Sequence, residues 1–323
     1  MKLKLFTHND LDGIGNIIIA QQLVKYGIYE ELNFETCSYI DINSKTLDYL
    51  NNPQENTMLL FTDISVSDEV AQKIDKLDIE KQLLDHHRSA LELNKYSWCN
   101  VEEIIDGTIT SDRPEGFKNC GTKMFFDAIQ PSLISKIPKE SMKTLIEFVN
   151  LVREYDTWEW EVNDNLEPKR LNDLLFMKGQ DKFITSMLYK IDNGQEVFSL
   201  DDLNDLYKRQ IKINKYIDEK EKFLVEVNIK GLNAGVVIAE NYISELASTI
   251  LKRRIDLEIL VILNGKTASL RTRRNNIDLS KLAEEYGGGG HQKASGFTLT
   301  PEMLKLGYSK MFNGDNWGKF ENK

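Results

Sequence analysis

The first half of the chain alternates short apolar runs with longer segments of helical periodicity. Apolar runs at residues 3–6, 58–61 and 82–84 predict buried strands, whereas residues 13–26 and 66–77 predict helices. Strands that alternate with helices indicate an α/β fold with a doubly wound parallel sheet. In such a sheet the side chains that follow the strands gather at one edge, where ligand sites form.

The rest of the chain predicts more helix and then a second sheet. Residues 106–120 are rich in Gly, Thr, Ser, Asp and Pro and predict a loop, followed by helical segments from residue 122 to about residue 156. Residues 201–222 are charged and periodic with few breakers, which predicts a linker helix. A second pattern of this kind follows. Residues 234–239, 257–263 and 267–271 predict strands, whereas the segment from 239 through 251 and residues 277–286 predict helices.

Length indicates two domains. A chain of 323 residues exceeds one ordinary hydrophobic core. The pattern places a first domain at residues 1–190, a helical linker at 191–227 and a smaller α/β domain at 228–323.

Composition narrows the classes of protein that the chain can belong to. Hydrophobic content of 41% and charged content of 28% are typical of a soluble globular protein, and no run of 18 apolar residues predicts a membrane span. The N-terminus has no signal-peptide pattern, and Cys37, Cys99 and Cys120 form no C-x-x-C pair, so we expect a cytoplasmic protein without disulfides or a Cys-rich zinc site. The net charge of −10 disfavours long duplex nucleic acid but leaves small anionic substrates open.

Aspartate and histidine cluster after the predicted strands. Three of the four histidines lie in two segments, His8-Asn9-Asp10-Leu11-Asp12-Gly13 and Asp85-His86-His87. Side chains of this kind are suited to divalent metal ions. Residues 8, 10 and 12 alternate, so in an extended loop they would point the same way. Six candidate ligands fall at or just after element ends: His8, Asp10, Asp12, Asp63, His86 and Asp156.

Charge predicts that such a cluster needs two cations. Four aspartates held together would repel one another and raise their own pKa values, and two divalent cations would cancel their four charges. The ions would lie roughly 3.5–4 Å apart, bridged by one carboxylate and by a water that acts as a hydroxide nucleophile near neutral pH. Mixed carboxylate and imidazole ligands favour manganese over calcium.

Each residue alone has a simpler interpretation. A lone Asp63 or Asp156 would usually be a helix N-cap or a turn residue, and Asp12-Gly13 alone fits a plain turn. A lone His86-His87 pair is more often structural than metal-binding. The order of the segments along the chain is what favours a metal site.

These segments resemble the four motifs of the DHH phosphoesterase superfamily, with Asp63 as the second motif and Asp156 as the fourth. Residues 288–296, Gly-Gly-Gly-His-Gln-Lys-Ala-Ser-Gly, resemble the glycine-rich signature of its DHHA1 domain, and Ser269-Leu270-Arg271 resembles the segment before it. Residues 153–160 and 170–173 are similar to the nano-RNase B-type branch, which degrades short RNA. The resemblance implies a catalytic DHH domain, a substrate-binding DHHA1 domain and an active site in the cleft between them.

The resemblance also implies the division of ligands. One manganese ion would bind three residues and the other four, with Asp63 shared between them. The first set is His8, Asp10 and Asp63, and the second set is Asp12, Asp63, His86 and Asp156.

By the same resemblance, three residues beside these ligands would serve the reaction at the phosphate. His87 would face the scissile phosphate, donating to a non-bridging oxygen or protonating the leaving group. Asp85 would orient an active-site imidazole. Arg88 would add positive charge, although a solvated surface arginine is an equal alternative.

The glycine run at residues 287–290 has no helix or strand propensity. Four glycines allow positive φ and a close approach of backbone amides to an anion, but alone they usually form a flexible loop. No G-K-[ST] follows and a predicted helix precedes, so neither a P-loop nor a dinucleotide fingerprint is present. By the resemblance, substrate would be held by Arg271, Gly288, Gly289, Gly290 and His291.

Two further groups have open interpretations. Tyr155 and Trp158 have helical spacing, so core packing is the default for them and for Trp160, with base stacking as the alternative. The basic runs at 252–254 and 273–274 are usually solvated faces, but in the second domain they could steer RNA.

By the same resemblance we expect a manganese-dependent phosphodiesterase that trims short single-stranded RNA to nucleoside 5′-monophosphates. A cyclic-dinucleotide phosphodiesterase and a 3′-phosphoadenosine 5′-phosphate phosphatase share the chemistry, and a silent nucleotide-binding module is the alternative from another class. The GGGH segment counts against a pyrophosphatase, and the length leaves no room for the additional domains of a RecJ-type nuclease. No membrane or protein partner is inferred, and a homodimer stays open.

Overall fold

The computed structural model describes residues 1–111 and 114–312, which fall into two compact units, Met1–Leu206 and Tyr207–Lys323. The division lies within helix α9 (Leu200–Glu221), which occupies the segment predicted as a linker helix. In the described part of the chain, no helix is both long and apolar enough to cross a membrane.

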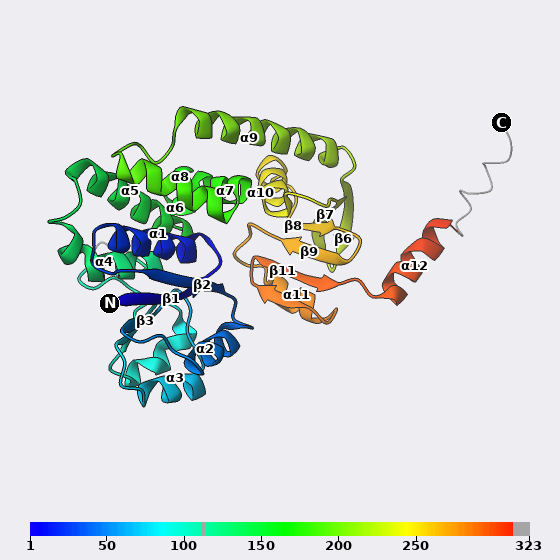
Figure 1. Ribbon diagram of the computed structural model, residues 1–323. Coiled ribbons are helices and arrows are strands. Elements are labelled where there is room, and N and C mark those ends of the chain that lie inside the picture. The colour runs from blue at the N-terminus through cyan, green and yellow to red at the C-terminus, as the bar shows by residue number, and fades with distance from the viewer. Residues whose placement is uncertain (112–113, 313–323) are drawn as a thin grey trace. The chain divides into compact units, whose positions relative to one another are not determined.

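The first unit is built on a parallel sheet with the strand order β2-β1-β3-β4-β5 (Figure 1). All four strand pairs are parallel, which confirms the predicted fold class. The apolar runs predicted as strands are β1, β3 and β4, whereas β2 and β5 were not predicted, because β2 is only half-buried and β5 is very short. The strands are β1 (Lys2–His8), β2 (Leu32–Cys37), β3 (Thr57–Thr62), β4 (Lys81–Asp85) and β5 (Cys99–Val101).

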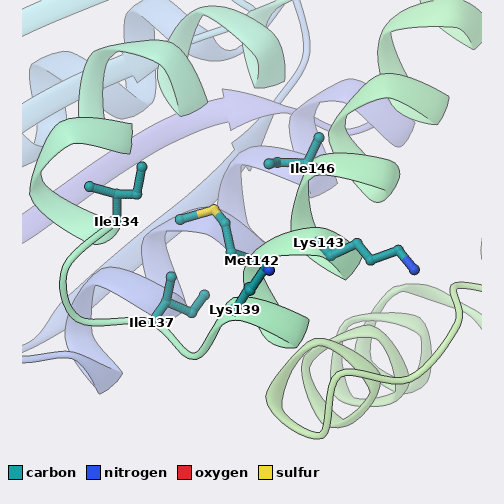
Figure 2. A pocket seen from close by; sticks show the side chains of 6 residues that line it. All are labelled: Ile134, Ile137, Lys139, Met142, Lys143 and Ile146. Atoms are coloured by element: carbon teal, nitrogen blue, oxygen red, sulfur yellow. The ribbon is translucent and has the colours of Figure 1, made fainter.

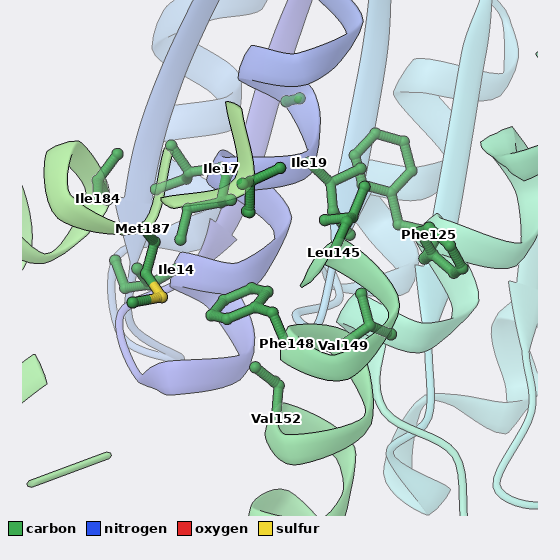
Figure 3. Close-up of a cluster of buried hydrophobic side chains, with 14 of the residues drawn as sticks. Ile14, Ile17, Ile19, Phe125, Leu145, Phe148, Val149, Val152, Ile184 and Met187 are labelled. Carbon is green, nitrogen blue, oxygen red and sulfur yellow. The ribbon is translucent and has the colours of Figure 1, made fainter. Parts of the chain in front are cut away.

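Alternate residues of the central strands enter two different cores. Leu5 and Leu60 face a cluster formed with α1, α4, α5, α7 and α8, part of which Figure 3 shows. Phe6 and Phe61 face a second cluster, formed with α2, α3 and the 3₁₀ helix η1. Because both faces are covered, the centres of β1, β3 and β4 are apolar, and polar residues follow at the edge. The helices of this unit are α1 (Leu11–Lys25), α2 (Ile42–Leu50), α3 (Asp68–Asp75), η1 (Arg88–Lys95), α4 (Gly121–Leu133), α5 (Lys139–Asp156), α6 (Glu159–Val162), α7 (Glu167–Lys178) and α8 (Gln180–Asp192).

The predicted loop at 106–120 consists of turns closed by an isolated bridge between Ile104 and Lys118. Its residues 112–113 lie outside the described part of the chain. The helices predicted from 122 to 156 are α4 and α5.

The second unit contains a six-stranded sheet with the order β10-β11-β9-β8-β7-β6. Only β7 and β8 pair in parallel, and the other neighbours are antiparallel. Helix α10 and the second half of α9 cover one face, and α11 covers the other. The strands are β6 (Val225–Ile229), β7 (Leu232–Ile238), β8 (Ile259–Leu263), β9 (Thr267–Arg271), β10 (Gly289–His291) and β11 (Ala294–Thr298), and the helices are α10 (Ile243–Arg253), α11 (Leu279–Glu284) and α12 (Pro301–Phe312).

The glycine run behaves differently from the sequence expectation. Gly289 to His291 form strand β10, although the run has no strand propensity of its own. The antiparallel pairing of β10 with β11 supplies the backbone hydrogen bonds that the glycines by themselves do not favour.

Candidate functional site

Three neighbouring strands of the first sheet deliver polar side chains to its carboxyl edge. Strand β1 ends at His8, β3 ends just before Asp63, and β4 ends at Asp85. Because the strands are parallel and adjacent, their ends meet at one place. Helix α5 ends there too, with Asp156 as its last residue, and Asp12 lies in the first turn of α1.

Candidate ligand atoms converge at this edge in overlapping groups. Ligand atoms of His8, Asp10 and Asp63 lie within 4.8 Å of one another, as do those of Asp12, His86 and Asp156. The Nε2 atom of His86 joins the two groups, because it lies 3.2 Å from Oδ1 of Asp63, 3.7 Å from Oδ2 of Asp12 and 3.6 Å from Oδ2 of Asp156. The structure therefore brings all six predicted ligand residues together.

The first motif is not an extended loop, which corrects one step of the sequence argument. Helix α1 begins at Leu11, and Asp10 is its N-cap, with Oδ1 accepting a hydrogen bond from the Gly13 N–H at 3.0 Å. Gly13 cannot be replaced by a larger residue, because a Cβ atom there would lie 1.9 Å from the carbonyl oxygen of His8. The tight turn between strand and helix, not strand alternation, aims these carboxylates.

The N-terminus of α4 holds Asp12 in place. The backbone N–H groups of Gly121 and Thr122 donate to the two carboxylate oxygens of Asp12, at 2.6 Å and 2.7 Å. A Cβ atom on Gly121 would lie 2.5 Å from Cβ of Asp63, so the helix approaches this closely only with glycine there. Sequence reasoning missed both residues, although a Gly-Thr pair at the start of a predicted helix is a recognisable anion-binding signal.

Several atoms of the site lack the partners that buried polar groups normally have. Oδ2 of Asp63 and Nδ1 of His8 are buried without a hydrogen-bond partner, although Nδ1 lies 2.9 Å from Oδ2 of Asp10. Asp63 also adopts a left-handed backbone conformation with φ of 59°, which non-glycine residues rarely do. Such strain and unsatisfied burial mark functional sites.

Electrostatics indicates that the cluster is made for cations. Burial and the neighbouring carboxylates of Asp12 and Asp10 raise the pKa of Asp63 well above its ordinary value. The same causes raise the pKa of Asp156 to about 8. Divalent cations would remove this repulsion, and carboxylate oxygens with imidazole nitrogens are a donor set that Mn²⁺-type ions accept. The residues present therefore fit a divalent metal centre.

Beside the ligands, Asp85 orients His87. Nδ1 of His87 lies 2.7 Å from Oδ1 of Asp85, which also accepts the backbone N–H groups of His86 and His87, and Ser65 donates to the other oxygen. Burial opposes protonation of His87, but the Asp85 carboxylate outweighs it and raises the pKa of the imidazole. Nε2 of His87 faces outward and lies 3.0 Å from the hydroxyl of Tyr39, a residue that the sequence argument missed.

Comparison with known proteins shows the family of the chain. The chain is 33% identical over 322 residues to the oligoribonuclease NrnB of Bacillus subtilis. The matched region covers 96% of this chain and 76% of NrnB. Residues 220–307 match the DHHA1 domain family. The chain belongs to the DHH/DHHA1 phosphoesterase superfamily, in its nano-RNase B-type branch. It is therefore an enzyme of the DHH phosphoesterase type.

Solved structures show the same fold. A pGpG-specific phosphodiesterase, PggH from Vibrio cholerae, superposes with a TM-score of 0.53 at 12% identity, over 96% of this chain and 98% of PggH. The exonuclease RecJ bound to manganese superposes with a TM-score of 0.50 at 12% identity, over 99% of this chain and 91% of RecJ. At these identities the likeness concerns the α/β architecture alone.

In the DHHA1 domain, Arg271 and His291 share one face of the sheet. Ala294 pairs with Arg271 on one side and with His291 on the other, so the three residues form a row across β9, β11 and β10. Directly paired residues point to the same face, and residues two strands apart are roughly 10 Å from each other. The row therefore presents a guanidinium and an imidazole on either side of a methyl group.

Two glycines of the predicted set are sterically required. A Cβ atom on Gly288 would lie 2.1 Å from the carbonyl oxygen of Gly296. Gly290 has φ of 139°, and a Cβ atom there would lie 2.7 Å from the carbonyl oxygen of Ala294. Gly289 has open space around it, so its side of the strand is free for an incoming group.

In the basic run at 252–254, two arginines already have carboxylate partners. Arg253 is ion-paired with Asp218 and Glu221, and Arg254 is ion-paired with Glu226 and Asp256. Arg271 differs, because its guanidinium donates only to backbone carbonyls, those of Leu270 at 2.9 Å and Ser295 at 3.4 Å. No carboxylate of the described residues pairs with it.

The remaining predicted residues divide clearly. Arg88 opens η1 and is exposed, so it is free to contact a ligand or solvent. Tyr155 packs against the core of the DHH domain, as expected. Trp158 is 63% exposed, so the expectation of core packing is wrong for this residue.

A pocket of about 430 Å³ in the DHH domain is separate from these residues (Figure 2). It lies where the end of α4 meets the start of α5, and its lining carries no carboxylate or imidazole. It is lined by Ile134, Ile137, Lys139, Met142, Lys143 and Ile146.

Proposed function

We propose that this chain hydrolyses short single-stranded RNA oligonucleotides to nucleoside 5′-monophosphates, using two divalent cations, most suitably Mn²⁺. The observation that supports this most strongly is the meeting of two ligand groups around Asp63 and His86. The 33% identity with an oligoribonuclease supports RNA as the substrate.

The proposed ligand sets follow the two groups in the DHH domain. Asp63 lies between them and is the proposed bridge, because its carboxylate approaches both His8 and His86. When bound, the cations would neutralise the phosphate and lower the pKa of the attacking water. One set is His8, Asp10 and Asp63, and the other is Asp12, Asp63, His86 and Asp156.

His87 is the proposed proton donor. Asp85 holds Nδ1–H of the imidazole, so Nε2, which lies 3.0 Å from the Tyr39 hydroxyl, is the nitrogen that we propose faces the scissile phosphate. Protonated Nε2 would donate to a non-bridging oxygen or pass its proton to the leaving 3′-oxygen, so that the 5′-phosphate stays on the released nucleotide. The exposed Arg88 would add positive charge at the same phosphate.

In the DHHA1 domain, Arg271 and His291 are the residues that we propose bind the terminal phosphate or base. A half-buried guanidinium without a carboxylate partner favours an anionic ligand, because burial lowers the pKa of Arg271 and an anion would offset that cost. Gly288, Gly289 and Gly290 would let the backbone approach the ligand closely.

The test is a substrate panel with Mn²⁺-loaded protein. RNA of two to five nucleotides, RNA of about 25 nucleotides, cyclic dinucleotides and 3′-phosphoadenosine 5′-phosphate are compared by kcat/KM. We expect the highest value for the short RNA. A preference for cyclic dinucleotides or for the phosphoadenosine would favour the corresponding alternative, and binding without hydrolysis would favour a nucleotide-binding module.

A further inference from the structure

One aromatic residue that follows a proposed metal ligand closely in the sequence is largely exposed. Helix α5 ends at Asp156, and Trp158 follows two residues later, with 63% of its surface exposed. Two residues of chain span at most roughly 7 Å, so the backbone of Trp158 lies within that distance of the backbone of a proposed metal ligand. A large aromatic side chain that stays exposed contributes little hydrophobic stabilisation to the fold, so stability does not account for a tryptophan at this position.

The backbone at Trp158 is held in an unfavourable conformation. Its φ of 61° lies in the left-handed region, which glycine adopts freely and a tryptophan rarely does. The turn is fixed on both sides: the Thr157 N–H donates to the carbonyl of Arg153 at 3.0 Å, and the Trp158 N–H donates to that of Tyr155 at 3.2 Å. Strain that the surroundings enforce is a sign of function.

A buried ion pair reinforces the same turn. The guanidinium of Arg153 donates to both carboxylate oxygens of Glu159, at 2.9 Å and 3.1 Å. Arg153 lies before the turn on α5 and Glu159 lies directly after Trp158, so this two-bond contact ties the two sides together. The position of Trp158 is therefore set by the fold.

Two other aromatic rings pack in a row with the indole of Trp158. The ring centroids of Trp158 and Trp160 are 5.9 Å apart at an interplanar angle of 31°, and those of Trp160 and Tyr155 are 6.4 Å apart at 15°. Tyr155 in turn packs against the core. Within the described residues the buried indole nitrogen of Trp160 has no hydrogen-bond partner, so ring contacts, not a side-chain hydrogen bond, position this indole.

We propose that Trp158 is a stacking platform for a nucleobase of the strand whose phosphate lies at the metal centre. This inference rests on the proposed function and specifies one of its substrate contacts. A preordered ring that is largely exposed offers a base a stacking surface at little entropic cost. Because every base has a π-face, the platform would accept any sequence and favour purines, which stack more strongly.

The first test compares substrates with and without a base. Diadenylate is compared with analogues that carry an abasic ribose on one side of the phosphodiester, using Mn²⁺-loaded protein. Trp158→Ala should lower the ratio of kcat/KM for diadenylate to that for one abasic analogue by roughly 5- to 150-fold, the range typical of a lost base–aromatic stack. The analogue for which the ratio changes identifies which nucleotide stacks.

Conservative and matched variants sharpen this test. Trp158→Phe should keep most of the preference, because a smaller ring still stacks. Phe176→Ala removes another aromatic side chain of the same unit, 76% exposed on α7, and should leave the ratio unchanged. An unchanged ratio in Trp158→Ala, or an equal loss for all substrates, would overturn the proposal.

Trp158→Gly separates function from stability. Glycine adopts the left-handed conformation without strain. The melting temperature should therefore stay the same or rise, while the preference for base-bearing substrates falls. If Trp158 were a structural residue, the melting temperature would fall together with the activity.

A binding measurement keeps this inference distinct from the proposed function. Affinities of the Mn²⁺-loaded parent and Trp158→Ala for adenosine 5′-monophosphate and ribose 5-phosphate are measured by calorimetry. The parent should prefer the nucleotide and the variant should lose that preference, even if the parent hydrolyses no RNA. A parent that hydrolyses short RNA but binds both ligands equally would contradict the platform alone.

Discussion

The DHH and DHHA1 domains carry unmatched charge of opposite sign. In the DHH domain several buried carboxylates crowd around two histidines, and burial and repulsion raise the pKa values of Asp63 and Asp156. In the DHHA1 domain, Arg271 is half-buried, and among the described residues its guanidinium donates only to carbonyls. Because a folded chain gains nothing from unmatched buried charge, the two places are the ones we propose for ligands of opposite sign: cations in one domain and an anion in the other.

Asp202 shows what a matched buried carboxylate looks like in the same molecule. It is as buried as Asp63, but Lys178 lies 2.6 Å away and Lys190 also pairs with it. Burial alone would raise its pKa, yet the two lysines outweigh burial and hold the pKa below its ordinary range. The contrast teaches that the partners of a buried aspartate, and not its burial, separate a structural site from a functional one.

The largest expected effect is the loss of the shared ligand. Asp63→Ala should remove bound metal and abolish turnover, a larger loss than the roughly 10- to 100-fold typical of an outer partner. His87→Ala should keep the metal content and lower kcat by about 10²- to 10⁴-fold, because it removes a proton donor. Elemental analysis and steady-state kinetics measure both.

Asp63→Asn controls for the backbone, since asparagine tolerates the left-handed conformation that alanine does not. Asp68→Ala, which removes an exposed ion pair with Lys95, should change neither metal content nor rate. Metal loss in the His87 variant would contradict these roles.

Next in size is a pair of stability changes of opposite sign. Without metal, Asp63→Asn should stabilise the fold, because it removes an unmatched buried charge. Asp202→Asn should destabilise it by about 3–5 kcal/mol, since Lys190 is left buried and unpaired. Urea titrations in excess chelator measure both. If the two substitutions changed stability in the same direction, the contrast between matched and unmatched charge would fail.

The anion side of the comparison should respond more weakly. Arg271→Ala and His291→Ala should keep the metals and lower kcat/KM for short RNA by roughly 10- to 150-fold, the effect of losing a charged hydrogen bond worth about 1.5–3 kcal/mol. Arg254→Ala is the matched control, because its charge is already paired with Glu226 and Asp256. An equal effect of all three substitutions would point to general electrostatics.

Stability of the metal-free protein should fall as the pH rises from about 5 to 8. Asp156 has a folded pKa of about 8 and that of His87 is also raised, so the folded chain holds protons that the unfolded chain has released. The free energy of unfolding therefore decreases with pH across this window. Melting temperatures at pH 6, 7 and 8 test this, and saturating Mn²⁺ should flatten the dependence. A metal-free protein that is most stable at pH 8 would contradict it.

The smallest expected effect is the salt dependence of binding. A chain of net charge −10 that holds one end of a short strand gains little from additional phosphates, so affinity should fall only shallowly with salt. RNA of two to five nucleotides is compared with RNA of about 25 across a salt series. Steep dependence, together with a preference for the long RNA, would instead indicate a nuclease that follows the strand.

Much of the catalytic domain was predictable because its chemistry is local. The strands that end at His8, Thr62 and Asp85 have apolar runs at their centres, and these runs predict the strands from the sequence alone. Strand β2 was not predicted, although alternating polar and apolar residues are themselves a strand signal; Lys4 of β1 bonds to two of its polar residues, Asn33 and Glu35. Side chains that obtain their partners from another strand do not show their burial in the local pattern.

The sequence by itself determined the family, the parallel sheet, the order of the motifs and the six candidate ligands, because each is written in consecutive residues or in short-range periodicity. Only the tertiary structure decided which groups hold those ligands. Gly121 and Thr122 reach Asp12 across 109 and 110 residues, Tyr39 reaches His87 across 48, and Trp158 points outward where its helical spacing predicted the core. Contacts of this kind depend on where elements that are distant in the sequence meet, and local hydrophobic patterns do not predict those meeting points.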